Sequence, residues 1–337
     1  MTKDAGRTRI RGIGRCVPQR VVTNDDLSHL METDDEWIQQ RSGIRSRHHV
    51  TEDTGAADLG AVAAREALQR AGVDAAEIDC VMFATLSPDY DMPSSACVLQ
   101  DRLGISGVPA FDIRNQCTGF LYGLTAADAF LQAGRYKKIL LVGGEIHSTG
   151  VEFTTRGRQL AVLFGDGAGA VVLDRGDDPR RGILSTHLHS EGKYAEKLWL
   201  QGVEGRASRR LTPEMINGDD PAIYPKMVGR YVFKHAVTRS IEAIQEAVEA
   251  NGYAVSDLDL LVPHQANLRI NQAVAMTLEF PEEKVVNNIQ TLGNTTAATI
   301  PLALYDALED GRLRDDSLVC LVAFGAGFTW ASALMRW

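Results

Sequence analysis

The chain contains an internal repeat, and this repeat constrains its fold more than any other feature of the sequence. Residues 65–88 (REALQRAGVDAAEIDCVMFATLSP) and residues 245–267 (QEAVEANGYAVSDLDLLVPHQAN) each read as an amphipathic helix, a glycine, a short acidic turn and a buried apolar strand. The same order of elements continues from Cys117 and from Asn294, at an offset of about 180 residues. Each copy closes on a glycine-rich turn and an apolar strand (FGDGAGAVVLD and FGAGFTWASALMRW). We therefore expect two similar α/β halves with mixed sheets.

The repeat divides the chain into an N-terminal half, residues 1–175, and a C-terminal half, residues 176–337. Residues 176–230 break the pattern, because they are rich in Arg, Gly and Pro and show weak periodicity. Prolines and the turn sequence GDD recur within this stretch. We therefore expect a long excursion over the surface there, rather than core.

Composition narrows the class of protein. With 35 Lys plus Arg against 44 Asp plus Glu, the net charge of −9 argues against nucleic acid or an anionic membrane as a partner of the whole surface. No apolar run reaches the ~18 residues that span a membrane, and the N-terminal MTKDAGRTRIRG lacks the apolar stretch of a secretory signal. Neither a CxxC pair nor an even-numbered disulfide framework is formed by the cysteines, Cys16, Cys80, Cys97, Cys117 and Cys320. We expect a reduced, cytoplasmic, globular enzyme.

Three polar residues stand at junctions between strands and helices. Cys117 follows the strand VPAFDIR and opens an apolar helix, where the helix N-terminus should lower the pKa of the thiol. His264 ends the strand LDLLVP, and Asn294 begins the helix that aligns with that of Cys117. Equivalent loops of the two halves thus offer a nucleophile, a proton carrier and a hydrogen-bond donor. A backbone N–H in the turn GAGF could complete an oxyanion hole.

Metal and nucleotide sites lack support in the sequence. His187 and His189 would share one strand face, but two ligands without a third are weak evidence for a metal. The turns GDGAG and GAGF do not follow the GxGxxG spacing, and no GxxxxGK[ST] occurs. We therefore predict no metal and no nucleotide cofactor.

One helix of this acidic protein has a basic face. Arg230 and Lys234 fall at helical spacing, and Arg269 follows the His264 junction. A cluster of this kind beside the candidate site favours an acidic macromolecular substrate.

In these residues the chain resembles β-ketoacyl-acyl-carrier-protein synthase III, from about residue 9 to its end. The matching stretches are TNDDL, TDDEWIQQRSGIRSRH, QCTGF, RGRQLAVLFGDGAGAVVL, PHQANLRI, GNTTAATIPLAL and AFGAGFTWASAL. The resemblance implies the thiolase fold, an internally duplicated five-layered αβαβα core, and a homodimer.

The resemblance also implies a mechanism. Cys117 would be acylated by an acyl-CoA, with its own N–H and that of Gly327, or a neighbour in GAGF, as oxyanion hole. Malonyl-acyl-carrier protein (malonyl-ACP) would then lose carbon dioxide, and the carbanion would attack the acyl-enzyme. His264 and Asn294 would stabilise the enolate. The product would be a 3-oxoacyl-ACP, which initiates fatty acid biosynthesis, and no cofactor is needed.

Further residues receive roles from the same resemblance. They are Trp37, Arg41 and Arg156 for CoA, Lys234, Arg269 and Arg230 for the carrier protein, and Met92 and Phe164 for the acyl pocket. Met92 replaces a phenylalanine of acetyl-specific relatives, and a flexible methionine would accept longer or branched chains. The segment 200–225 also looks longer than is usual in the family. These departures give an alternative to the initiation of fatty acid biosynthesis: a specialised synthase of secondary metabolism that uses a longer, branched or aromatic acyl thioester.

Four other classes of protein share parts of this pattern. A papain-like peptidase also uses Cys, His and Asn, but no CGSCW-like motif occurs. A degradative thiolase would place a second cysteine in the turn GAGF, which holds none. A hydroxymethylglutaryl-CoA synthase needs a glutamate as general acid or base, for which Glu145 is a candidate by position. A non-catalytic carrier-protein scaffold would not need Cys117, His264 and Asn294 intact.

Overall fold

Two mixed β-sheets form the centre of the fold in the computed structural model, which describes residues 6–51, 53–202, 211–218 and 220–337. The first sheet has the order β1-β7-β6-β4-β5, and its strands are β1 (Thr8–Cys16), β4 (Cys80–Ala84), β5 (Ala110–Ile113), β6 (Lys138–Glu145) and β7 (Gly167–Arg175). The second has the order β11-β12-β13-β8, and its strands are β8 (Gly182–Ser190), β11 (Leu260–Pro263), β12 (Leu318–Gly325) and β13 (Thr329–Arg336).

The two sheets repeat one pairing pattern. In the first sheet, β4 pairs parallel with β6, and the pairs β6–β7 and β7–β1 are antiparallel. In the second sheet, β11 pairs parallel with β12, and the pairs β12–β13 and β13–β8 are antiparallel. Even the edge strand β5 has a trace of a counterpart, because a parallel bridge joins Leu261 of β11 to Val285. The fold class expected from the sequence, a duplicated α/β architecture, is confirmed.

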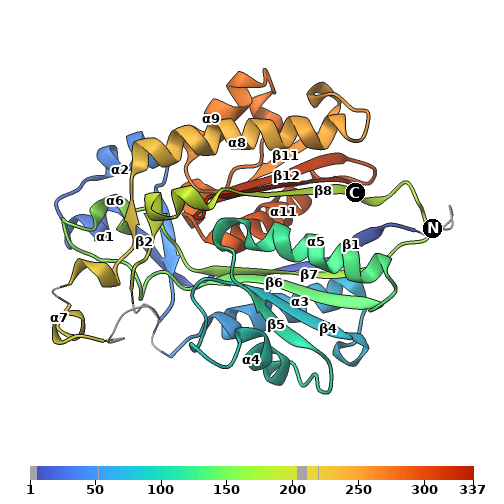
Figure 1. The fold of residues 1–337 in the computed structure, drawn as a ribbon, viewed down its shortest axis with the longest axis horizontal. Coiled ribbons are helices and arrows are strands. Elements are labelled where there is room, and N and C mark those ends of the chain that lie inside the picture. Colours follow the sequence, from blue (N-terminus) through green and yellow to red (C-terminus); the bar gives the residue numbers. More distant parts are fainter. Residues whose placement is uncertain (1–5, 52, 203–210, 219) are drawn as a thin grey trace.

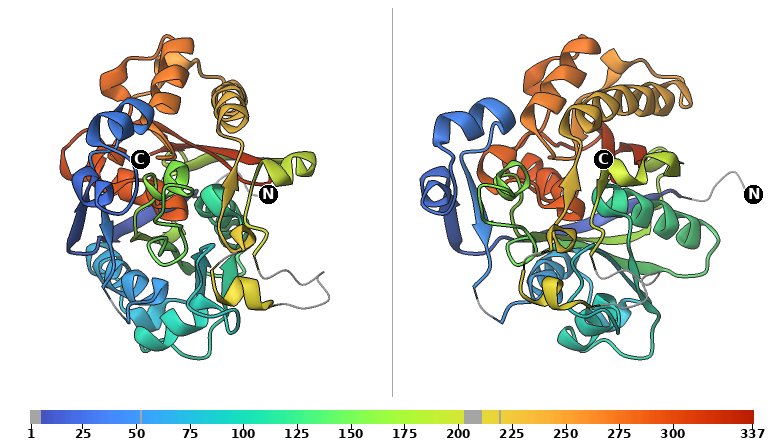
Figure 2. Two further views of the ribbon diagram at one scale, coloured as in Figure 1. Left: turned by 90° about the vertical axis from the view of Figure 1, so that its left-hand side faces the viewer. Right: turned by 60° about the vertical axis from the view of Figure 1, so that its left-hand side comes forward.

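Helices enclose and separate the sheets in five layers (Figures 1 and 2). The layer below the first sheet holds α3 (Ala56–Ala71) and α4 (Ser95–Arg102), the central layer holds α5 (Gly119–Gln132) and α11 (Thr299–Glu309), and the layer above the second sheet holds α8 (Gly229–Glu249) and α9 (Leu268–Thr277). Because both faces of each sheet are covered, β4, β6 and β12 are almost continuous buried apolar runs.

The central layer joins the halves into one core. Phe120 and Leu124 of α5 pack in the same buried cluster as Ile300 and Leu304 of α11, together with strands of both sheets. The approach is close at Gly143 of β6, where a Cβ atom would lie 2.4 Å from the carbonyl oxygen of Ala297. Only glycine fits there, so the segment that follows Asn294 rests directly on the N-terminal sheet.

The remaining elements are short. The helices are α1 (Asn24–Ser28), α2 (Asp35–Ser42), α6 (Arg158–Ala161), α7 (Pro213–Ile216) and α10 (Ile289–Leu292), and the strands are β2 (Arg20–Thr23), β3 (Ser46–His49), β9 (Leu198–Trp199) and β10 (Lys226–Met227). The 3-10 turns are Ala75–Glu77, Gln116–Thr118, Gly192–Lys197, Pro221–Ile223, Val255–Asp257, Glu282–Lys284 and Thr296–Ala298. Across the described ranges, no helix has the length and apolar character needed to cross a bilayer.

The excursion expected at 176–230 needs correction, because β8 (Gly182–Ser190) is a strand of the second sheet, paired with β13. The polar residues of β8 obscure the apolar pattern expected of a sheet strand. His187 and His189 both contact Glu246 of α8, with N–O distances of 3.3 and 2.6 Å. The expected extra length at 200–225 lies partly outside the described residues, at 203–210 and 219.

Candidate active site

A cavity of about 490 Å³ opens in the face where the loops of both halves meet. Cys117, His264 and Asn294 all line it, although they come from three separate junctions between strand and helix. The structure therefore brings together the three residues that the sequence singles out.

Cys117 is held between a turn of its own and the end of β12. It lies in the 3-10 turn that precedes α5, and its neighbour Gln116 has a φ of +45°, a backbone angle that non-glycine residues rarely adopt. A Cβ atom on Gly325 would come within 3.0 Å of the Cys117 Cβ. The glycine at the end of β12 thus lets the C-terminal half approach the thiol closely.

The expectation of a lowered thiol pKa is wrong. Burial raises the pKa of the Cys117 thiol to about 12, the nearby Glu145 carboxylate adds to the rise, and the backbone N–H groups of Cys117 and Ala326 oppose it. Loss of solvent therefore outweighs these N–H groups, which the sequence argument did not weigh against burial. The resting thiol is neutral at pH 7, and its proton must leave when the sulfur attacks.

The same two N–H groups are candidate donors for an oxyanion hole. Both lower the pKa of the Cys117 thiol, so Ala326 is the residue of the turn GAGF whose N–H acts on the sulfur. Neither Ala326 nor Gly327 lines the cavity, and Gly327 has a φ of +134° within the turn. Ala326 is among the neighbours of Gly327 named from the sequence, and the oxyanion hole stays a prediction.

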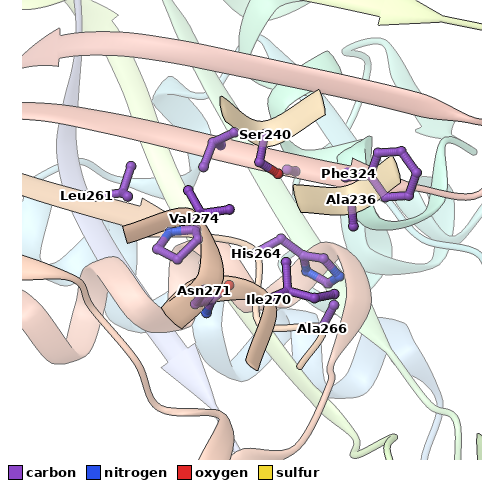
Figure 3. Close-up of a pocket in the computed structure, with 12 residues that line it drawn as sticks. Ala236, Ser240, Leu261, His264, Ala266, Ile270, Asn271, Val274 and Phe324 are labelled. Carbon is purple, nitrogen blue, oxygen red and sulfur yellow. The ribbon is translucent and has the colours of Figure 1, made fainter. Parts of the chain in front are cut away.

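His264 is buried directly after β11. Its Nδ1 lies 2.7 Å from the Thr299 hydroxyl oxygen, while Nε2 has no hydrogen-bond partner among the described residues. Its surroundings are apolar (Figure 3): Ala236, Ile270 and Phe324 line the same small cavity of about 20 Å³ beside it. Burial lowers the pKa of His264 to about 3, so the ring is neutral at pH 7.

Asn294 is fixed by both its backbone and its side chain. Its backbone N–H donates to the Leu163 carbonyl, and its own carbonyl accepts from the Gly165 N–H. Its Oδ1 accepts from the backbone N–H of Thr296 at 2.9 Å. The amide therefore presents Nδ2, a donor, as its remaining group.

The rim of the cavity carries Trp37 between two guanidinium groups. Arg41 lies 4.3 Å and Arg158 lies 4.9 Å from the centre of the indole ring. Arg156, which the resemblance assigns to CoA binding, instead pairs with Glu152, with an N–O distance of 2.7 Å. The sequence RGR offers two arginines, and the structure brings Arg158 to Trp37.

Basic residues continue along the rim. Arg230 and Arg269 are exposed and line the cavity, and Arg269 lies 5.8 Å from the ring of Phe233. Lys234 is exposed one turn further along α8 and is not part of the cavity wall.

The two expected acyl-pocket residues differ in position. Phe164 lines the cavity and stacks at 4.6 Å on His147, whose Nε2 is 2.6 Å from the Thr296 hydroxyl. Met92 is 84% exposed and does not line the cavity of this chain.

Comparisons with known proteins identify the family of the chain. The family model described as 3-oxoacyl-[acyl-carrier-protein (ACP)] synthase III matches residues 111–192, and the model of its C-terminal part matches residues 248–337. The chain is 43% identical over 330 residues to β-ketoacyl-[acyl-carrier-protein] synthase III of Methylococcus capsulatus, which covers 98% of this chain and 99% of that protein. The chain belongs to the β-ketoacyl-acyl-carrier-protein synthase III family.

Solved structures of related enzymes superpose on almost the whole chain. The 3-oxoacyl-[acyl-carrier-protein] synthase III of Aquifex aeolicus superposes with a TM-score of 0.89 at 40% identity, covering 98% of this chain and all of that one. The priming β-ketosynthase of the R1128 polyketide pathway has a similar TM-score of 0.88 but only 31% identity, with 100% and 98% covered. The synthases III of Methylococcus capsulatus and Aquifex aeolicus are thus nearer in sequence than this polyketide enzyme, and the chain is a 3-oxoacyl-ACP synthase III acyltransferase.

The glutamate that a hydroxymethylglutaryl-CoA synthase would need is not available in this synthase III. Glu145 is fully buried and accepts hydrogen bonds from Thr85 and from the backbone and side chain of Ser87. Its carboxylate does not line the cavity. It fixes the loop after β4 instead.

Proposed function

We propose that this synthase III works through an acyl-enzyme on Cys117, with His264 and Asn294 as the groups that stabilise the enolate of malonyl-ACP. The observation that carries the proposal is that a thiol, an imidazole nitrogen and an amide donor line one cavity. Cys117 and Asn294 stand at equivalent junctions of the two halves, before α5 and α11, and His264 follows β11.

The first half-reaction uses the thiol. The Cys117 sulfur attacks the carbonyl carbon of acyl-CoA and forms a new C–S bond, the thioester bond to CoA breaks, and the thiol proton goes to the departing CoA sulfur. The N–H groups of Cys117 and Ala326 stabilise the oxygen of the tetrahedral intermediate.

The second half-reaction uses the other two groups. The bond between the malonyl carboxylate and its α-carbon breaks, and the electron pair moves toward the thioester oxygen, where His264 and Asn294 donate hydrogen bonds. The α-carbon then attacks the acyl group, the C–S bond to Cys117 breaks, and the thiolate recovers a proton from solvent. The product is a 3-oxoacyl-ACP.

Intact-protein mass spectrometry tests the acyl-enzyme and names the primer. We would mix the enzyme with acetyl-, isobutyryl-, hexanoyl-, octanoyl- and benzoyl-CoA in turn and measure the mass added. A single acyl adduct supports the proposal, and its best-loaded chain identifies the primer. No adduct from any of the five would contradict loading from CoA.

The Trp37 rim is proposed to hold the adenine of CoA. Trp37→Ala or Arg158→Ala should raise KM for acyl-CoA about tenfold, because adenine stacks on planar indole and guanidinium groups with ~1–3 kcal/mol each. Arg156→Ala is the matched control, two residues away and paired with Glu152. Steady-state kinetics decides: an equal effect of both arginine variants would refute the assignment.

The basic rim is proposed to dock the acidic carrier protein. Arg269→Glu or Lys234→Glu should raise KM for malonyl-ACP about fivefold, which corresponds to about 1 kcal/mol of exposed charge interaction, with less effect at high salt. Lys137→Glu makes the same charge change at the start of β6, the strand end away from the cavity. If it weakened malonyl-ACP as much, the docking surface would lie elsewhere.

We also propose a homodimer in which Met92 reaches the acyl pocket of the second copy. The support is its 84% exposure in a single chain, the highest of any large apolar side chain in the described residues. Sedimentation equilibrium at the mass of one 36.7 kDa chain would contradict it. The cytoplasmic location stays a prediction.

A further inference from the structure

Thr299 is the hydrogen-bond partner of His264, and neither the sequence patterns nor the comparisons assign it a role. It opens α11, and its hydroxyl oxygen lies 2.7 Å from Nδ1 of His264, which directly follows β11 in the adjacent layer. With Nδ1 held on this side, Nε2 is the ring nitrogen left for substrate. Nε2 is buried and has no partner among the described residues.

The proposed chemistry demands one particular proton position on the ring. A neutral imidazole carries a proton on one nitrogen and a lone pair on the other. The oxygen of a thioester only accepts hydrogen bonds, so Nε2 must carry the proton when the enolate forms. Nδ1 must then be the acceptor, and a buried acceptor requires a donor.

The Thr299 hydroxyl is able to be that donor. Among the described residues, this hydroxyl is also placed to donate to the Thr296 carbonyl oxygen, at 2.9 Å, so its single hydrogen has two possible acceptors. That carbonyl already accepts the backbone N–H of Thr299, whereas Nδ1 has the Thr299 hydroxyl as its one partner in the same residues. The hydrogen therefore satisfies one more polar group when it points to Nδ1. The ring lies beside buried apolar side chains, and burial alone shifts its pKa. The ring is therefore neutral, and its contact with Thr299 decides which nitrogen carries the proton.

We propose that Thr299 is a positioning residue that fixes His264 as the neutral tautomer with its proton on Nε2. Thr299 does not touch the substrate; it acts through the ring. The inference rests on the proposed role of His264 in the second half-reaction, and it extends that role to a residue on a different helix. Together, Nε2–H of His264 and Nδ2–H of Asn294 then form a pair of donors for the thioester oxygen.

Two replacements separate the hydroxyl from its shape. Thr299→Val keeps the branched side chain and removes the hydroxyl, whereas Thr299→Ser keeps the hydroxyl. Thr125→Val is the matched control, since it removes a partly buried threonine hydroxyl from another helix, α5, where that hydroxyl donates to the Leu121 carbonyl and not to His264. Thermal unfolding of all three shows whether the fold is kept.

Nitrogen-15 NMR of histidine-labelled enzyme reads the tautomer directly, with the His264 signals assigned by their loss in His264→Gln. We expect the proton on Nε2 in the wild type and in Thr299→Ser, and a mixed or reversed tautomer in Thr299→Val. A wild-type proton on Nδ1 would overturn the proposal, whatever the role of His264 in catalysis.

The two half-reactions give the kinetic readout. Thr299→Val should slow malonyl-ACP decarboxylation toward the 10²–10³-fold loss typical of a missing donor, with at least a tenfold effect. Acyl loading of Cys117 should change by less than about twofold, and Thr299→Ser should restore decarboxylation. Equal losses in both half-reactions, or no rescue by serine, would assign Thr299 a merely structural role. If His264→Ala left decarboxylation intact, the proposed function would fail while the NMR result would still stand.

Discussion

Replacing Cys117 by alanine should abolish acyl loading and with it the whole reaction. The acyl group has no other thiol to accept it on the wall of the cavity, because Cys117 is the one cysteine among its described lining residues. Loss of a nucleophile costs at least about 10³-fold in turnover, since what remains is only binding and the oxyanion donors. Intact-protein mass spectrometry should show no acyl adduct, and condensation measured with malonyl-ACP should fall to background.

Cys97→Ala provides the control for this measurement. Cys97 is the exposed cysteine of the chain and sits on α4, so it is the thiol most open to non-enzymatic acylation. Its replacement should leave the adduct unchanged in mass and rate. An adduct that persists in Cys117→Ala and disappears in Cys97→Ala would show that the acyl group is carried at the wrong site for this mechanism.

The architecture can be predicted from the sequence because the internal repeat gives the order of helices and strands in each half. Helix, glycine and apolar strand recur in order, and each step is a local pattern, such as Gly72 and Gly252 ending helices in left-handed conformations. β8 was missed for a physical reason. An edge strand whose polar side chains meet Glu246 does not alternate as a strand on a purely apolar core does.

Which residues belong to the site could also be predicted, but their chemical state could not. Cys117, His264 and Asn294 each stand at a junction between a strand and a helix, and the corresponding loops of the two halves meet at one cavity. The thiol pKa depends on how much solvent the second half removes, which no local pattern records. Sequence reasoning also missed Thr299, because its contact with His264 spans 35 residues and two layers.

Neighbouring positions in one motif were the other source of error. Arg156 and Arg158 flank one glycine, and Ala326 and Gly327 are adjacent, so a match of residue type fits either member of each pair. A shift of one or two positions changes which group meets its expected partner. The contacts of Arg158 with Trp37 and of Arg156 with Glu152, and the effect of the Ala326 N–H on the thiol pKa, distinguish the members of each pair.

Replacing His264 or Asn294 by alanine should separate the two half-reactions. Each variant removes one donor to the developing enolate, so decarboxylation of malonyl-ACP should fall by about 10²–10³-fold, while Cys117 still loads an acyl group at nearly the wild-type level. Release of carbon dioxide from labelled malonyl-ACP and the mass of the acyl-enzyme measure the two steps independently.

The same pair should show strong coupling. Both donors address one oxygen, so the double variant should lose little more than the worse single variant, as groups that act as a unit do. Asn294→Asp tests the donor directly: it keeps Oδ1 for the Thr296 N–H but replaces Nδ2 with an acceptor, and it should be as inactive as alanine. Loss of loading with intact decarboxylation in any of these variants would reverse the roles, because the histidine and the amide would then serve the thiol rather than the malonyl thioester.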